Sequence, residues 1–308
     1  MPNSTPLVAI KCLVFNHEPY LRDCLEGFVM QQTDFPFVAI VHDDASTDHS
    51  ADIIREYAAK YPDIILPIYE TENQYSKPDG SLGRIMNAAV DATGAQYIAL
   101  CEGDDYWTDP HKLQKQVSFL EFHPDYSMCF HKAEILNTIG ITPSIHCTDI
   151  EDRDYFATEL FVRWVVPTAS IVYRKESVEA FPIKHPEWIL YGDIILVEKC
   201  CHVGKVHGLS DAMSVYRMQG DSMVHSPRYK ATRLQKAPLA FRCIYLNFNK
   251  IDRNAIRWCI SHAYYSRSKL STRPIVKRVW DICCCFYWEP NIIISKVKNK
   301  LMRKSTIN

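Results

Sequence analysis

The chain has 308 residues, which is enough for one large domain or two smaller ones with a sizeable hydrophobic core. Hydrophobic residues make up 47% of the chain and charged residues 23%, as in an ordinary folded globular protein. The formal net charge of −1 excludes overall charge as a reason to expect nucleic-acid binding, although it can conceal local asymmetry.

The twelve cysteines do not resemble a disulfide framework, because no paired CxxC spacing appears and several of them are contiguous or lie in apolar runs. We therefore expect reduced thiols in a cytosolic setting. The polar start MPNSTP lacks the regions of a signal peptide, and no uninterrupted apolar run reaches the length that spans a bilayer. These features predict a cytoplasmic protein that is soluble or attaches peripherally to a membrane.

Strands and helices alternate through the first third of the chain. Apolar runs rich in branched residues predict strands at Leu7–Phe15, Phe37–His42, Ile64–Tyr69 and Tyr97–Cys101. Apolar residues at helical spacing predict a helix in each interval between these strands. The alternation predicts an α/β fold with a Rossmann-like, mostly parallel sheet flanked by helices.

The rest of the chain is less regular. We expect helices at His111–Phe122, Phe156–Val165 and Ile189–Cys200, and strands at Tyr126–His131, Ala169–Tyr173 and Ser210–Arg217. The segment Asn137–Asp154 is polar and rich in breakers, which predicts a mobile loop with the properties of a lid. Beyond Ser226 the pattern is helical and basic. The predicted domains are residues 1–226, the α/β domain, and residues 227–308, a helical C-terminal appendage.

Two acidic clusters follow predicted strands. Asp43-Asp44 ends the second strand, and Glu102–Asp105 (EGDD) places three carboxylates after the fourth. Such crowded carboxylates repel each other unless a cation is present, and Mg²⁺ or Mn²⁺ prefers their oxygen atoms. Because ligands bind beyond the carboxyl ends of the strands in such sheets, we expect the clusters to meet at one crevice. The alternative for the second cluster is an acidic turn that caps the helix after Asp109-Pro110.

The order of these segments resembles glycosyltransferase family 2 with the GT-A fold. The matching segments are VAIKCLVFNHEPYLRDCLEGF, VHDDASTD and YIALCEGDDYWTDPHKLQKQ, and the resemblance weakens from mid-chain to about Ser226. It implies an enzyme that moves a sugar from a nucleotide-sugar donor, with a UDP-sugar favoured, to a hydroxyl of a glycan or lipid-linked acceptor. Biosynthesis of a bacterial surface polysaccharide is the expected setting.

The resemblance also implies roles for single residues. Asp104 would be the metal ligand, and Glu102 would lie at the ribose end, where the family usually has Asp. Asp44 would hydrogen-bond the base with support from Asp43. The other residues expected near the donor are Asn16, Glu18, Arg84, Asp105 and Arg217.

Arg217 is expected to pair with the donor diphosphate through its guanidinium group. Its neighbour Gln219 stands where many relatives carry His, which puts a metal or phosphate role of position 219 in doubt. The alternative for the segment Arg217–Ser222 is a surface turn.

The expected chemistry needs a cation and a base. Sugar transfer leaves a diphosphate with developing negative charge, which a divalent cation (Mg²⁺ or Mn²⁺) stabilises as a Lewis acid. The acceptor hydroxyl must lose a proton as it attacks, and this requires a general base. The segment WILYGD resembles the family's base motif, so Asp193 is the candidate catalytic residue, and direct displacement would invert the anomeric configuration. The alternative is that Asp193 caps the following helix.

The C-terminal region is basic, with Arg267–Arg278 and Lys296–Lys304 as its most charged stretches. The aromatic residues between these stretches are Trp280, Phe286, Tyr287 and Trp288. A basic amphipathic helix with aromatic residues can lie on an anionic membrane, which fits a lipid-linked acceptor. The alternative is a solvated charged face beside a small helical unit. No recognised module accompanies these charges, so we expect no nucleic-acid partner.

Two other functions stay open. A sugar nucleotidyltransferase would need a Gly-rich, basic phosphate loop after the first strand, and the segment NHEP supplies neither property. A catalytically silent nucleotide-sugar-binding module would bind the donor without turnover, and the retained DDAS, EGDD and Asp193 argue against it. A two-carboxylate glycosidase is disfavoured, because nucleotide and metal ligation explain the acidic residues better.

Overall fold

The computed structural model describes residues 5–77, 79–138, 147–183, 192–219, 227–292 and 294. The chain divides into two compact units, Met1–Pro182 with Leu196–Gly220 and Ile183–Ile195 with Asp221–Asn308. The domain boundary predicted at residue 226 lies outside the described residues.

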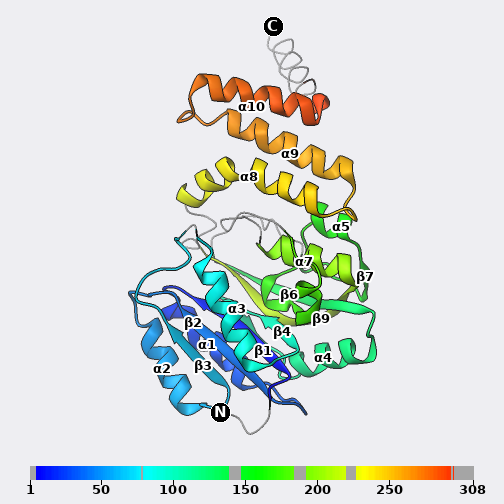
Figure 1. Cartoon of the computed structure of the whole chain (residues 1–308). Coiled ribbons are helices and arrows are strands. Elements are labelled where there is room, and N and C mark those ends of the chain that lie inside the picture. The colour runs from blue at the N-terminus through cyan, green and yellow to red at the C-terminus, as the bar shows by residue number, and fades with distance from the viewer. Residues whose placement is uncertain are drawn as a thin grey trace. The chain divides into compact units, whose positions relative to one another are not determined.

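A nine-stranded sheet forms the centre of the first unit (Figure 1). The strands in the described residues are β1 Val8–Val14, β2 Phe37–Asp43, β3 Ile65–Tyr69, β4 Tyr97–Leu100, β5 Tyr106–Trp107, β6 Tyr126–Asn137, β7 Arg153–Tyr155, β8 Val172–Arg174 and β9 Lys205–Met218. Their order is β3-β2-β1-β4-β8-β6-β9-β5, and β7 pairs with β9 outside this path. Only β5, β7 and β8 run against the other strands, so the predicted mostly parallel sheet is confirmed.

Helices cover both faces of this sheet. The helices before the C-terminal region, within the described residues, are α1 Glu18–Val29, α2 Ser50–Lys60, α3 Ser81–Thr93, α4 Lys112–Phe122, α5 Ala157–Val162, α6 Lys175–Glu179 and α7 Gly192–Val203, of which α7 spans the division between the units. Alternate residues of β1, such as Ile10 and Cys12, share one core with the apolar faces of α1, α2 and α4. Lys11 points to the other face, where its Nζ lies 3.4 Å from Asn87 Oδ1 of α3. The sheet is therefore buried between helices, as its apolar strands predict.

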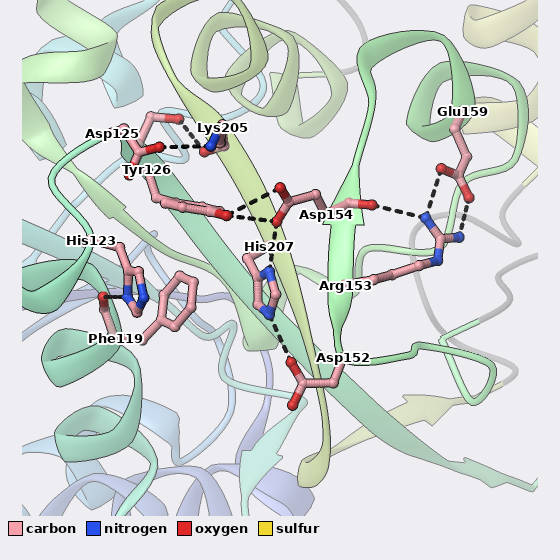
Figure 2. A network of polar contacts seen from close by, with 11 residues as sticks. Phe119, His123, Asp125, Tyr126, Asp152, Arg153, Asp154, Glu159, Lys205 and His207 are labelled. Atoms are coloured by element: carbon pink, nitrogen blue, oxygen red, sulfur yellow. Dashed lines mark hydrogen bonds and ion pairs between the residues drawn. The ribbon is translucent and has the colours of Figure 1, made fainter.

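The end of the predicted mobile loop is a strand. Arg153–Tyr155 forms β7 and pairs antiparallel with β9. His207 of β9 lies between two carboxylates, with Nδ1 2.8 Å from Asp154 Oδ1 and Nε2 2.8 Å from Asp152 Oδ1 (Figure 2). The loop prediction is wrong for these residues, because the side chains around His207 hold β7 on the sheet. Residues 139–146 of the predicted loop lie outside the described residues.

Besides the first turn of α7, the second unit contains three helices in its described residues, which confirms the predicted helical appendage. They are α8 Pro227–Asn247, α9 Arg253–Ser268 and α10 Ile275–Trp288, and α9 packs between the other two (Figure 1). Throughout the described part of the chain, every helix is too short or too polar to cross a bilayer.

Candidate active site

The two acidic loops meet at the carboxyl end of β1. The backbone N–H of Asp44 donates to the carbonyl of Val14 at 2.8 Å, and the N–H of Gly103 donates to the carbonyl of Leu13 at 3.0 Å. Two consecutive carbonyls of β1 thus each accept one hydrogen bond, Val14 from the loop after β2 and Leu13 from the loop after β4. The two loops meet here because β2 and β4 flank β1 on either side. The prediction that both clusters lie at one edge of the sheet is confirmed.

Gly103 is the point of closest approach between the EGDD loop and the loop after β1. A Cβ atom at this position would lie 2.7 Å from His17 Nδ1 and 3.0 Å from a methyl carbon of Val14. Atoms do not approach so closely, so any larger residue here would require the His17 side chain or the loop itself to move.

Asp43 and Asp44 are both buried below the surface of this edge. The carboxylate of Asp44 accepts hydrogen bonds from the backbone N–H groups of Gln74 at 2.6 Å and Tyr75 at 3.0 Å. Asp43 Oδ2 accepts from Ser46 N at 3.4 Å, whereas its buried Oδ1 has no partner among the described residues. Asp44 therefore anchors the loop after β3, and Asp43 keeps one free acceptor; which of the two contacts a base stays a prediction.

Asn16 and Glu18 connect the loop after β1 to the loop after β2. Asn16 has a positive φ of 56°, and its Oδ1 accepts a hydrogen bond from Thr47 N at 2.7 Å. Glu18 Oε2 accepts from His49 N at 3.1 Å, next to the first turn of α2. These contacts shape the loops at the sheet edge, and a direct contact of either side chain with a nucleotide stays a prediction.

The EGDD loop concentrates negative charge. Glu102 is exposed, Asp104 is half-buried and Asp105 is 2% exposed. Burial, together with repulsion from Asp104 and Glu102, raises the pKa of Asp105 well above its usual range. Burial and the same three carboxylates also raise the pKa of Tyr216 to about 12. The carboxylates are therefore crowded, as the sequence predicts for a cation site.

A neutral amide side chain lies beside the carboxylates of the EGDD loop. Gln219 Nε2 lies 3.5 Å from Asp104 Oδ2, which places an amide group beside the predicted metal ligand. Among the described residues, no group of three or more His, Cys, Asp or Glu side chains forms a preassembled metal cluster. Mg²⁺ is commonly held by one or two carboxylates together with substrate phosphates, so this donor set fits such an ion.

Arg217 holds the EGDD loop against α1. Its backbone N–H donates to Asp105 Oδ1 at 2.8 Å, and its Nη1 donates to the carbonyl of Asp104 at 3.1 Å. Its Nη2 pairs with Asp23 of α1, and its Cζ lies 4.4 Å from the ring centroid of Tyr106. The alternative of a surface turn is therefore wrong for Arg217, which lies in β9 and is 9% exposed. The sequence carries no signal for Asp23, because 194 positions separate it from Arg217.

Arg84 lies in the first turn of α3, and its side chain is 61% exposed. Its guanidinium contacts the carbonyl of Asp79 in the preceding loop. Its role toward a donor stays a prediction.

Lys112 is a buried residue of this region that sequence reasoning missed. It is 0% exposed, and its Nζ donates to Gln116 Oε1 at 2.7 Å and lies 4.0 Å from the ring centroid of Trp107. Burial lowers the pKa of Lys112 to about 7. The pattern HKLQKQ could have revealed it, because positions 112 and 116 are neighbours on one helical face.

Asp193 is the second residue of α7 and belongs to the second unit. Its Oδ1 accepts a hydrogen bond from Ile194 N at 2.9 Å, and burial raises the pKa of its carboxyl. A carboxyl with a raised pKa is suited to proton transfer near neutral pH. The other residues of the predicted base motif, Trp188–Tyr191, lie outside the described residues.

The sequence is similar to a known protein family and to individual proteins. The family model described as "Glycosyl transferase family 2" matches residues 12–180. The uncharacterized protein Rv1520 of Mycobacterium tuberculosis is 35% identical over 227 residues, which are 71% of this chain and 61% of that protein. The chain thus spans less than two thirds of the length of this relative.

Two solved structures share the fold. TarS 1-349 of S. aureus in complex with UDP-GlcNAc has a TM-score of 0.63 and 16% identity, over 91% of this chain and 80% of that chain. The mannosyltransferase PcManGT from Pyrobaculum calidifontis in complex with GDP-Man and Mn²⁺ has a TM-score of 0.54 and 16% identity, over 99% and 81%. The fold is the predicted GT-A fold. Because the family model covers more than half of its residues, the chain belongs to glycosyl transferase family 2.

Proposed function

We propose that the protein is a divalent-cation-dependent glycosyltransferase that moves a sugar from a nucleotide-sugar donor to an acceptor hydroxyl with inversion. The observation that carries this proposal is the convergence of the two acidic loops on Leu13 and Val14 of β1. In an open α/β sheet this edge is where ligands bind, and family membership supports a sugar donor as the ligand.

The donor would lie across the two loops. Asp43, which retains a free buried acceptor, is the stronger candidate for the base, while Asp44 holds the loop of Gln74 and Tyr75 that would border it. Glu102, which is exposed, would lie at the ribose end. A UDP-sugar is favoured, in line with the UDP-GlcNAc complex of the similar TarS structure.

The cation site would consist of Asp104 with Gln219 beside it and Glu102 within the same loop. A bound Mg²⁺ or Mn²⁺ would supply Lewis-acid stabilisation of the charge on the leaving diphosphate. The crowding that raises the pKa of Asp105 supports such a site, because a nearby cation relieves the repulsion among these carboxylates. The similar PcManGT structure contains Mn²⁺.

Arg217 would hold the EGDD loop in place rather than contact the donor directly. Its pairing with Asp23 and its bond to the carbonyl of Asp104 tie the EGDD loop to α1, and this would hold the loop toward the donor. A direct bidentate contact with the diphosphate would require the guanidinium to exchange its contact with Asp23 for the phosphate.

Asp193 would take the proton of the acceptor hydroxyl as that hydroxyl attacks the anomeric carbon. A single base that assists one direct displacement gives an inverted product. The acceptor would be a hydroxyl of a glycan or of a lipid-linked sugar in polysaccharide biosynthesis at the cytoplasmic side of a membrane.

The test is a panel of nucleotide sugars screened for stabilisation of the protein against heat and for hydrolysis with and without Mn²⁺. We expect one donor to raise the melting temperature and to be hydrolysed only with the metal, because ligands that bind the folded state stabilise it. Donor binding without turnover on any acceptor would identify a silent binding module instead. An absence of binding across the panel contradicts the proposal.

A further inference from the structure

Helix α10 carries an exposed apolar face. The exposed fraction is 81% for Val276, 66% for Trp280 and 77% for Tyr287. The residues of this face recur at helical spacing and therefore lie on one side of the helix. The apolar face of α10 consists of Ile275, Val276, Val279, Trp280, Phe286 and Tyr287.

The opposite side of α10 is fixed to α9. Asp281 is 0% exposed and accepts from Arg267 Nη2 at 2.6 Å and from Arg273 Nε at 2.6 Å. Ser261 Oγ donates to the carbonyl of Cys285 at 2.9 Å. These contacts correct the expectation that the whole stretch Arg267–Arg278 is a charged surface, because two of its arginines neutralise a buried carboxylate. They also present the apolar face of α10 outward as part of a packed unit.

The charge of the chain is divided unequally. Residues 227–308 contain eighteen Lys and Arg but three Asp and Glu, whereas residues 1–226 contain seventeen Lys and Arg and thirty-three Asp and Glu. The net charge of −1 thus conceals a C-terminal region at +15 and an N-terminal region at −16. The apolar face of α10 belongs to the cationic region, and Lys277 is exposed within the same helix.

We propose that the apolar face of α10 docks on the surface of an anionic lipid bilayer, with the helix lying in the plane of the interface. Apolar and aromatic side chains enter the headgroup boundary, where Trp and Tyr are favoured, and the surrounding Lys and Arg are attracted by anionic lipids. A second copy of this cationic region would be repelled by the first. A nucleic acid would use the positive charge but would leave Val276 and Trp280 in water. The proposal does not depend on sugar transfer.

The experiment measures binding of the full chain to vesicles of phosphatidylcholine alone or with about 30% phosphatidylglycerol, at about 0.15 M NaCl. We expect binding to the anionic vesicles that weakens as salt rises. The double variant V276S/W280S is expected to lower the vesicle affinity at least about tenfold, because two exposed side chains no longer enter the apolar boundary. Brominated lipids are expected to quench the fluorescence of the parent protein more than that of W280F.

The matched control is F122S/V162S, which removes two side chains of the first unit with exposed fractions of 81% and 65%. This variant is expected to bind vesicles like the parent. The proposal is overturned if the parent ignores anionic vesicles, or if the control loses as much affinity as V276S/W280S. It is also overturned if V276S/W280S abolishes self-association in light scattering while vesicle binding is unchanged, which would identify a second copy as the occupant. DNA binding that is as tight as vesicle binding and insensitive to V276S/W280S would overturn it as well.

The readout contains no donor and no acceptor. Vesicle binding can therefore fail while donor hydrolysis persists, and donor hydrolysis can fail while vesicle binding persists.

Discussion

Gln219 and Asp104 are neighbours across the candidate active site, with 3.5 Å between Nε2 and Oδ2 although 115 positions separate them in the chain. Gln219 follows the end of β9 and Asp104 follows the end of β4, so the sheet brings an amide to the side of a carboxylate. The carbonyl oxygen of an amide is a ligand type that suits both Mg²⁺ and Mn²⁺.

The first prediction concerns this pair. Asp104→Asn is expected to abolish the response of donor hydrolysis to Mn²⁺, because it removes the charge that holds the cation. Gln219→Ala is expected to raise the Mn²⁺ concentration for half-maximal rate about tenfold, in the range found for residues that support a metal ligand. Metal titrations of the hydrolysis rate measure both effects. Asp63→Asn, at an exposed position outside the site, is the control. An unchanged metal response in Asp104→Asn contradicts the assignment.

The second prediction concerns the base. Asp193→Asn is expected to lower the rate of sugar transfer by about a hundredfold or more, because the acceptor hydroxyl then lacks a group that takes its proton. The dissociation constant of the donor, measured by calorimetry, is expected to stay within a factor of about two, since the base acts on the acceptor. If Asp193→Asn transfers sugar at the parent rate, Asp193 has a structural role in the first turn of α7.

The third prediction separates two roles of Arg217. Arg217→Lys is expected to destabilise the fold by about 1–3 kcal/mol, because lysine cannot contact Asp23 and the carbonyl of Asp104 together and loses the contact with Tyr106. Asp23→Asn is expected to weaken the ion pair between Arg217 and Asp23 but to leave the Arg217 guanidinium available to the donor.

Chemical denaturation and the KM for the donor distinguish these outcomes. If Arg217 contacts the diphosphate, Arg217→Lys raises KM and Asp23→Asn does not. Equal increases of KM in both variants would show that the pair serves only to position the EGDD loop.

The fourth prediction concerns Glu198 of α7, which is 1% exposed and whose Oε2 has no partner among the described residues. Burial raises its pKa from 4.5 to about 8 in the folded protein. Between these two values the unfolded chain loses a proton that the folded protein keeps, so rising pH lowers the free energy of unfolding. The stability associated with the protonated Glu198 is fully present below about pH 4.5 and is lost as the pH rises through about 8.

Glu198→Gln removes this titration. The difference in free energy of unfolding between the variant and the parent is therefore expected to grow from pH 5 to pH 8. The expected growth is about 3–5 kcal/mol, because each unit of pKa shift corresponds to about 1.4 kcal/mol. Thermal or urea denaturation across this range measures the gap. The exposed Glu176→Gln is the control, and a gap that does not change with pH contradicts the prediction.

The sequence predicts the first half of the fold well, because β1, β2 and β4 are apolar runs with helices of regular spacing between them. The convergence of the acidic loops also follows, since the carboxyl ends of neighbouring parallel strands share one edge. β7 has no such signal: Arg153-Asp154-Tyr155 is short and charged, and its position depends on the distant His207 (Figure 2).

The partners of the site side chains could not be predicted for the same reason. Asp44 is satisfied by the backbone of Gln74 and Tyr75, and Arg217 by Asp23 of a helix near the start of the chain. Such contacts depend on tertiary packing, which leaves no periodic trace in the sequence. Motif resemblance therefore locates the acidic residues, but it does not separate those that face a donor from those that support a loop.

The absence of a side chain at Gly103 limits how this site can diversify. Any larger residue there would meet the side chains of His17 and Val14 and would force either these side chains or the EGDD loop to move. Changes of donor preference, whether by evolution or by engineering, are thereby directed to the exposed neighbour Glu102 and to the rims of the surrounding loops. A library that varies position 102 and keeps position 103 invariant should retain folded clones, whereas randomising position 103 should yield mainly misfolded ones.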